Sequence, residues 1–274
     1  MKVVSAGDRV EAGAYRLHSR FRRAANFTSP TRLVVLSDRS VGSGPISIVV
    51  DGELPKDDSL TVEPDALLLG GRRYSLGPRY DSALPGIPPE PAMVEVLVNR
   101  VRAAAHPKSL AFLLDASRIR NFGDGFEQNM IRQIQAGASK LFGEDPTPGV
   151  RLLRGCGFGL TPAGDDLLAG ALIGWRLREG RVPPRPWTAW KPSLPGGNVL
   201  SESFLALAAE GRVNEPMKNL LTALGGAEAE TVRAAANRVL AHGETSGADI
   251  LTGLVLAVHK GSNFQQPTPN RRGP

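Results

Sequence analysis

A glycine-rich segment directly ahead of an apolar run constrains the fold of this chain more than any other stretch. It reads Gly-Cys-Gly-Phe-Gly-Leu-Thr-Pro-Ala-Gly-Asp-Asp over residues 155–166 and precedes a helix that we predict over residues 167–178. Glycine permits positive φ and lets the backbone approach other groups closely. Thr161 is placed to cap the helix, and Pro162 suits its first turn. The segment therefore predicts a tight loop that opens directly into a helix.

The chemistry of this loop leaves two kinds of ligand open. The free N–H groups and positive dipole end of a helix N-terminus suit an anion. Asp165 and Asp166 have the opposite character, and they are expected to orient an amide nitrogen or to hold Mg²⁺. The loop lacks the Lys-Ser/Thr ending of a Walker loop and the glycine spacing of the dinucleotide fingerprint, so a nucleotide is not expected.

A motif similar to the start of this helix occurs 83 residues later in the chain. Residues 164–170 read Gly-Asp-Asp-Leu-Leu-Ala-Gly, and residues 247–253 read Gly-Ala-Asp-Ile-Leu-Thr-Gly. One interpretation is two helices that pack closely where glycine replaces a larger residue. The other is that both N-termini converge on one polar pocket, with Asp166 and Asp249 each contributing a carboxylate. Both interpretations remain open on the sequence alone.

The order of β-type and helical patterns predicts the fold class. Short β-prone runs at 33–36, 46–50, 66–69 and 74–76 are separated by glycine and proline turns. A proline-rich joint at 85–91 follows, and the apolar periodicity then becomes helical. The expected helices cover residues 92–105, 126–142, 167–178, 201–210, 215–224, 227–241 and 248–259.

The sequence therefore predicts an α+β protein. Its N-terminal strand-rich part, a small sheet or barrel, is expected over residues 1–90 and its mainly helical part over residues 91–260. The helical part would carry both glycine-rich motifs. Residues 261–274, rich in Pro, Gln, Asn and Arg, are expected to form a disordered tail.

Charge and cysteine content limit the class of protein. The formal charge is +6, but 26 of the 33 basic residues are arginines spread along the chain, and aromatic residues make up only 5%. We therefore do not expect nucleic-acid binding, which usually clusters charge and interleaves aromatics. Cys156 is the single cysteine, so an internal disulfide is impossible and a reducing compartment is expected. With no secretory signal and no apolar stretch near the roughly 20 residues of a membrane span, we expect a soluble cytoplasmic protein.

Four further residues each have a functional and a structural interpretation. Asn198 and Ser201 follow a Gly-Gly pair and either cap a helix or face a ligand. Arg154 either neutralises a phosphate or carboxylate or lies on the surface. Cys156 is either a nucleophile or a small packing residue.

Three motifs together resemble the AllH-like family, and the resemblance covers most of residues 15–260. They are Gly-x-Gly-Leu-Thr-Pro-x-Gly-Asp-Asp at 157–166, Asn-x-x-Ser-x-x-x-Leu-x-x-Ala-x-x-Gly at 198–211 and Thr-Ser-Gly-x-Asp-x-Leu-x-Gly at 245–253. One branch of this family is a subunit of oxamate carbamoyltransferase that works with FdrA-like and AllG-like subunits. The resemblance implies a cytoplasmic, heteromeric transferase of purine catabolism and allantoin degradation.

The implied reaction interconverts oxalurate plus phosphate with oxamate plus carbamoyl phosphate. It requires sites for phosphate and carboxylate and donors for a carbonyl oxyanion. The predicted catalytic residues are Asp165, Asp166 and Asp249. The predicted substrate-binding residues are Gly157, Gly159, Thr161, Gly164, Asn198, Ser201, Thr245, Ser246, Gly247 and Arg154. The alternative is a non-catalytic binding or assembly subunit whose glycines serve helix packing. No cofactor is expected with certainty; Mg²⁺ is an open alternative.

Overall fold

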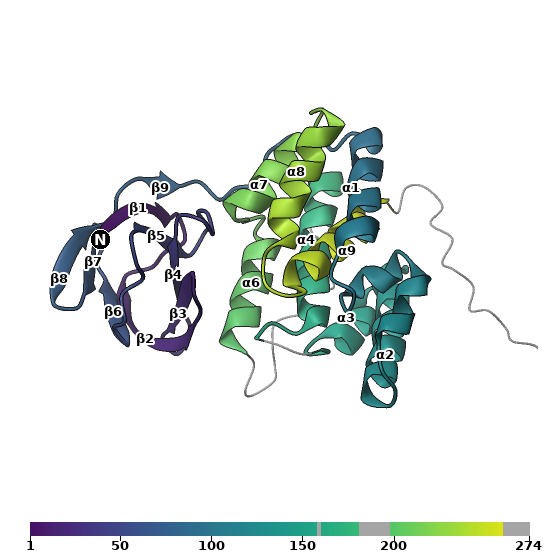
Figure 1. Cartoon of the computed structure of the whole chain (residues 1–274), viewed down its shortest axis with the longest axis horizontal. Helices are drawn as coiled ribbons and strands as arrows, with labels where there is room; N and C mark the ends of the chain where they lie inside the picture. The colour runs from purple at the N-terminus through teal and green to yellow at the C-terminus, as the bar shows by residue number, and fades with distance from the viewer. Residues whose placement is uncertain (158–159, 181–197, 260–274) are drawn as a thin grey trace, which may run out of the picture.

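A curled β-sheet followed by a bundle of helices makes up this protein, and the two parts lie side by side (Figure 1). The computed structural model describes residues 1–157, 160–180 and 198–259. The strands lie between residues 2 and 80, and the helices begin at Pro91. This order confirms the predicted α+β class. The predicted tail at 261–274 lies outside the described residues.

Within the described residues the N-terminal part forms one nine-stranded sheet of order β8-β7-β6-β2-β3-β4-β5-β1-β9. Most neighbouring strands are antiparallel, whereas β4–β5 and β1–β9 are parallel. The strands are β1 (Lys2–Gly7), β2 (Gly13–Arg20), β3 (Ala24–Thr28), β4 (Leu33–Asp38), β5 (Ser47–Asp51), β6 (Ser59–Val62), β7 (Ala66–Leu69), β8 (Arg72–Ser75) and β9 (Arg79–Tyr80).

The inner face of the curled sheet is an apolar core. Alternate residues of the strands point into it, including the fully buried side chains of Phe27, Leu36 and Ile48. The glycine turn predicted between the runs at 66–69 and 74–76 is confirmed: Gly70 and Gly71 have positive φ, 55° and 71°, and join β7 to β8. Glycine is needed there because other residues rarely adopt this conformation.

The C-terminal part is built from α-helices and two short 3-10 helices. The 3-10 helices are η1 (Leu110–Leu113) and η2 (Ala116–Asn121). The α-helices are α1 (Pro91–Ala104), α2 (Phe126–Leu141), α3 (Thr147–Leu153), α4 (Ala163–Glu179), α6 (Val199–Ala209), α7 (Glu215–Ala223), α8 (Ala229–Leu240) and α9 (Ser246–His259).

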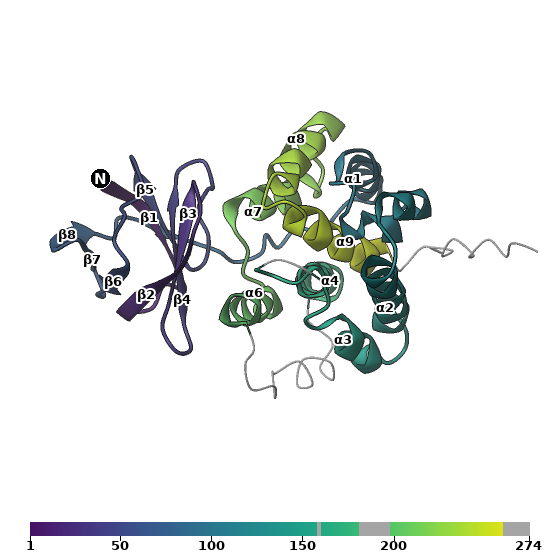
Figure 2. The ribbon, with the colours of Figure 1, turned by 60° about the horizontal axis from the view of Figure 1, so that its bottom comes forward.

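Helix α4 lies at the centre of this helical part. Every residue from 164 to 175 is buried, as expected for a helix that is covered on all sides. Figure 2 shows α4 along its axis, with α3, α6 and α9 around it. No helix in the described ranges is both long and apolar enough to cross a bilayer.

Helix α6 connects the helical part to the sheet. Leu200 and Leu207 of α6 pack against Leu33 of β4 and against Ile46, which precedes β5. The turn after α6 also contacts the N-terminal part, where Arg212 Nη1 donates to Asp8 Oδ2 at 3.0 Å. The position of α6 is therefore fixed by both parts of the molecule.

Candidate functional site

The two glycine motifs meet where α4 crosses α9. A Cβ atom added at Gly170 would lie 1.9 Å from the carbonyl oxygen of Ile250, and one added at Gly253 would lie 2.0 Å from that of Leu167. Real Cβ atoms do not approach a carbonyl oxygen this closely. The last glycine of each motif is therefore required for close helix packing, as the packing interpretation of the two similar motifs predicted.

The first glycine of each motif has a matching environment. A Cβ at Gly164 would lie 2.1 Å from the carbonyl oxygen of Leu153, and one at Gly247 would lie 2.0 Å from that of Val239. These two carbonyls belong to the preceding helices, α3 and α8. The units α3–loop–α4 and α8–loop–α9 thus repeat the same helix–loop–helix packing.

The N–H groups of these two glycines are already used. Gly164 donates to the Cys156 carbonyl at 2.8 Å, and Gly247 donates to the His242 carbonyl at 3.0 Å. Gly157 has a φ of 117°, and a Cβ there would lie 2.7 Å from a backbone nitrogen of α4. The loop glycines therefore hold the loops against the helix starts. The predicted ligand role of Gly157, Gly164 and Gly247 stays a prediction.

Hydroxyl groups join the two helix starts. Thr161 Oγ1 donates to Asp166 Oδ2 at 3.0 Å and lies 3.2 Å from Ser246 Oγ at the start of α9. The prediction that Thr161 caps α4 is wrong, because Pro162 occupies the N-cap position and Thr161 bonds a side chain instead. Two loops that are 85 residues apart in sequence thus share one polar junction, which we call the Thr161–Asp166–Ser246 junction.

Asp166 is the carboxylate of this junction, and its side chain is buried. Burial raises the pKa of Asp166 well above its usual value, because water no longer solvates the charged form. The Ser246 and Thr161 hydroxyls oppose the rise, while the negative charges of Asp249 and Asp165 add to it. Asp166 therefore binds a proton far more readily than an exposed aspartate does.

Asp249, the matching acid of the second motif, is fully buried. Its Oδ1 accepts a hydrogen bond from the backbone N–H of Leu110 at 2.6 Å, which anchors η1 to α9. Among the described residues no hydrogen bond reaches Oδ2. Burial raises the pKa of Asp249 to about 7, against the opposing effect of Leu110 and Thr245. No signal in the sequence pointed to Leu110, because the contact uses only its backbone.

Asp165 lies in a separate group of contacts next to the junction. Its Oδ1 accepts from the backbone N–H of Gly155 at 3.0 Å, and its Oδ2 accepts from Ser201 Oγ at 2.5 Å. Arg154 Nε lies 3.7 Å from Oδ1. Asp165 thus ties the glycine loop to α6, and Arg154 and Ser201 are both directed toward this carboxylate.

Asn198 connects the glycine loop to the start of α6. Its Oδ1 accepts from the backbone N–H of Leu200 at 3.1 Å, which confirms its predicted role as an N-cap. Its Nδ2 donates to the carbonyl oxygen of Leu160 in the glycine loop. Gly159, predicted to bind substrate, lies outside the described residues.

Cys156 faces the interior beside Asp165. Its side chain is buried, and burial together with the negative charge of Asp165 raises the pKa of the thiol. A raised pKa keeps the sulfur protonated, whereas a nucleophilic cysteine needs the thiolate. The geometry therefore favours the packing role over the nucleophile.

The donor groups do not form a metal site. In the part of the chain that the structure describes, no three His, Cys, Asp or Glu side chains are grouped so that they could hold a metal ion. The two oxygens of Asp165 already accept hydrogen bonds from Gly155 and Ser201. The described residues therefore do not fit the Mg²⁺ alternative.

Comparison with known proteins identifies the segment that carries both motifs. Residues 153–258 match the model of the family described as oxamate carbamoyltransferase subunit AllH. No curated protein and no solved structure matches the chain. The matched range runs from the end of α3 to the end of α9 and so includes the whole Thr161–Asp166–Ser246 junction. This match covers most of the helical part and agrees with the resemblance to the AllH-like family that the sequence motifs indicate.

Proposed function

We propose that this chain is a subunit of a heteromeric carbamoyltransferase of the oxamate type, with FdrA-like and AllG-like partner subunits. The observation that carries the proposal is the Thr161–Asp166–Ser246 junction, which lies inside the family match. A buried acid joined to two half-buried hydroxyls supplies a proton acceptor and hydrogen-bond donors at one place. In this proposal Thr245 and Asn198 line the same side of the junction.

The reaction needs one proton transfer and one acyl transfer. The amide nitrogen of oxamate attacks the carbonyl carbon of carbamoyl phosphate. A C–N bond forms, the bond between that carbon and the phosphate oxygen breaks, and oxalurate and phosphate result. The proton lost by the nitrogen is taken up by the departing phosphate. Any group that relays this proton must change protonation state near neutral pH.

Asp166 has the chemistry that this proton relay requires. Its pKa is raised well above the usual value, so it takes up a proton more readily than an exposed aspartate, and Thr161 Oγ1 links it to the partly exposed side of the junction. The Ser246 hydroxyl is placed to orient the carbamoyl group from the second loop. Asp249 lies deeper, and we propose that its charge sets the proton affinity of Asp166 rather than that it contacts substrate.

Reconstitution tests this proposal. The chain would be mixed with its FdrA-like and AllG-like partners, and phosphate release from carbamoyl phosphate would be measured with and without oxamate. The proposal predicts oxamate-dependent phosphate release together with oxalurate formation, and only when this chain is present. A complex that forms but releases no phosphate would overturn the proposed reaction.

The buried state of the acids favours a second candidate, an assembly subunit without catalytic groups. Asp165 and Asp166 are each 5% exposed and Asp249 is not exposed, while four glycines serve helix packing. In this case the junction would only hold α4 and α9 together. Thr161→Val separates the two candidates. In an assembly subunit this substitution would lower the stability of the chain, but the complexes that still form would keep their turnover rate.

A further inference from the structure

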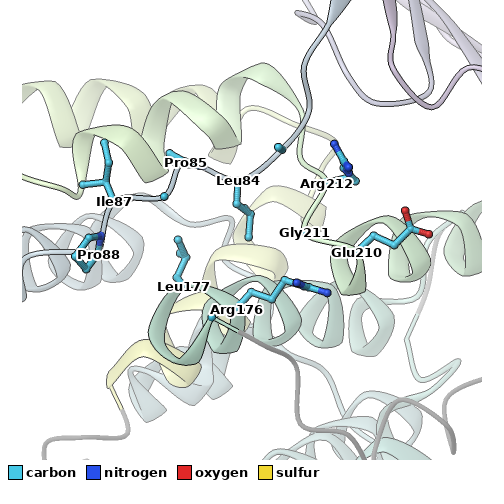
Figure 3. Close-up of a pocket in the computed structure, with 12 residues that line it drawn as sticks. Leu84, Pro85, Ile87, Pro88, Arg176, Leu177, Glu210, Gly211 and Arg212 are labelled. Atoms are coloured by element: carbon cyan, nitrogen blue, oxygen red, sulfur yellow. The ribbon is translucent and has the colours of Figure 1, made fainter.

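A cavity lies where the linker after the sheet, the C-terminal end of α4 and the turn after α6 meet. It has a volume of about 340 Å³, which is at the lower end of the range for small-molecule sites, about 300–1,000 Å³. Figure 3 shows its three walls: the linker that carries Leu84 and Ile87, the end of α4 with Arg176 and Leu177, and the turn after α6.

We call this cavity the hinge cavity, because one wall is the linker, residues 83–88, between the sheet and the helices. Its walls differ in polarity. Leu84, Ile87 and Leu177, together with prolines of the linker, supply an apolar surface. The opposite side carries the guanidinium groups of Arg176 and Arg212. A ligand that fits this cavity needs a compact apolar body and one end that accepts hydrogen bonds.

The arginines of the cavity have unused N–H donors. Arg176 donates from Nε to the Ala209 carbonyl at 2.5 Å, and none of the described residues pairs with its two terminal nitrogens. Arg212 binds Asp8 through Nη1, while its Nε is buried and has no hydrogen-bond partner among the described residues. The buried Nε of Arg212 is closed to solvent, so the two terminal nitrogens of Arg176 are the donors that remain for a ligand in the cavity.

The acid of the cavity does not compete for these donors. Glu210 also lines it, but Glu210 Oε2 lies 3.0 Å from Arg9 Nη2 and is paired there. Guanidinium groups bind carboxylates through two parallel hydrogen bonds, which Arg176 can still offer. We propose that this hinge cavity binds a small monocarboxylate with a compact apolar body, held by Arg176 and Arg212.

This site is separate from the proposed carbamoyl site. Arg176 lies ten residues beyond Asp166 on α4, which corresponds to about 15 Å along the helix axis. The cavity also includes the segment that joins the two parts: Leu84 N donates to the Gly211 carbonyl at 3.0 Å. A bound carboxylate would connect the linker, α4 and the turn after α6, and would thereby stabilise their relative positions.

Calorimetry with isobutyrate tests the proposal on the full chain, with isobutyramide as the uncharged match of the same shape. The expected result is saturable binding of isobutyrate and not of isobutyramide. Arg176→Gln retains an N–H donor that can reach Ala209 but removes the guanidinium fork. It should weaken isobutyrate binding about ten- to hundred-fold, the effect of one hydrogen bond to a charged group.

Arg178→Gln is the matched control, because Arg178 belongs to the same helix but donates to the Ala257 carbonyl at 2.8 Å instead of lining the cavity. It should leave isobutyrate binding unchanged. If Arg176→Gln does not fold, Arg212→Lys replaces it with the same expected loss. Absence of isobutyrate binding, equal binding of isobutyramide, or equal loss in Arg178→Gln would each overturn the proposal.

Discussion

The close crossing of α4 and α9 lets the effect of one substitution on stability be calculated from the structure. In Gly170→Ala, the new methyl group would lie 1.9 Å from the Ile250 carbonyl oxygen and 2.8 Å from the backbone nitrogen of Leu254. Both obstructing atoms belong to the backbone of α9, so no side chain can rotate out of the way. The two helices must therefore move apart along their crossing.

The expected loss of stability in Gly170→Ala is the balance of two opposing effects. Overpacking a core costs about 1–3 kcal/mol and occasionally more, and the rigid backbone contacts at Gly170 place this change at the upper end. Alanine regains about 1 kcal/mol because it is a better helix former than glycine. The net expectation is a loss of about 2 kcal/mol or more, which lowers Tm by about 4–8 °C in a protein of this size.

Thermal unfolding followed by circular dichroism checks this expectation, with Gly86→Ala as the matched control. No atom lies within 4 Å of a Cβ built at Gly86, and its φ is not positive, so the same substitution should be neutral or slightly stabilising there. If Gly170→Ala melts at or above the wild-type temperature, the close crossing of α4 and α9 is refuted.

Three further predictions concern the polar groups. Ser201→Ala removes the donor to Asp165 Oδ2 and should lower the free energy of unfolding by about 1–3 kcal/mol in urea denaturation; an unchanged midpoint would contradict the contact. The pKa of Asp249 is raised to about 7 in the folded protein, whereas the ordinary aspartate pKa is 3.8. Between these two pH values the folded state keeps a proton that the unfolded chain has lost. Wild-type stability should therefore fall as pH rises through this window, by up to about 1.4 kcal/mol per pH unit, and Asp249→Asn should reduce that slope; equal slopes in urea titrations would contradict the burial. The buried Cys156 thiol should react slowly with iodoacetamide in the folded protein, and Cys156→Ala should leave carbamoyl transfer intact, whereas loss of transfer in a folded variant would restore the nucleophile.

The class of fold and most helix positions follow from local sequence patterns. Predicted helix 126–142 is observed as Phe126–Leu141, and predicted helix 215–224 as Glu215–Ala223. These helices are amphipathic, so their 3.6-residue period is visible in the sequence. The glycines at the α4–α9 crossing were also interpretable from sequence, because each follows an apolar pair at the same spacing in both motifs.

The sequence patterns did not predict elements whose residues disfavour the observed secondary structure. Helix α3 contains Pro148 and Gly149, which favour a loop in isolation. A Cβ at Gly149 would lie 2.2 Å from the backbone nitrogen of Leu141, so this glycine is needed for the packing of α3 on α2. Strand β2 was hidden by the charged residues of its exposed face. In both cases the reason lies in tertiary contacts that a local pattern does not contain.

The candidate site was predictable in its residues but not in its connections. Sequence placed Thr161, Asp166 and Ser246 near two helix starts, and the structure joins them through hydroxyl contacts. The separate role of Asp165 depends on Ser201, 36 residues away, and on a backbone N–H. Adjacent aspartates on a helix point in different directions, so their partners are fixed only when the surrounding helices are in place.

The turnover rate of the reconstituted complex with Asp166→Asn tests whether Asp166 relays the proton in carbamoyl transfer. Asparagine retains the shape of the side chain but cannot exchange a proton, and Asp165→Asn is the matched control at the neighbouring position. We predict a fall in kcat of about 10²-fold or more for Asp166→Asn in complexes that assemble normally, as expected for loss of a proton-transferring group. For the assembled Asp165→Asn complex we predict a much smaller change. A wild-type kcat in the assembled Asp166→Asn complex would contradict this role of Asp166.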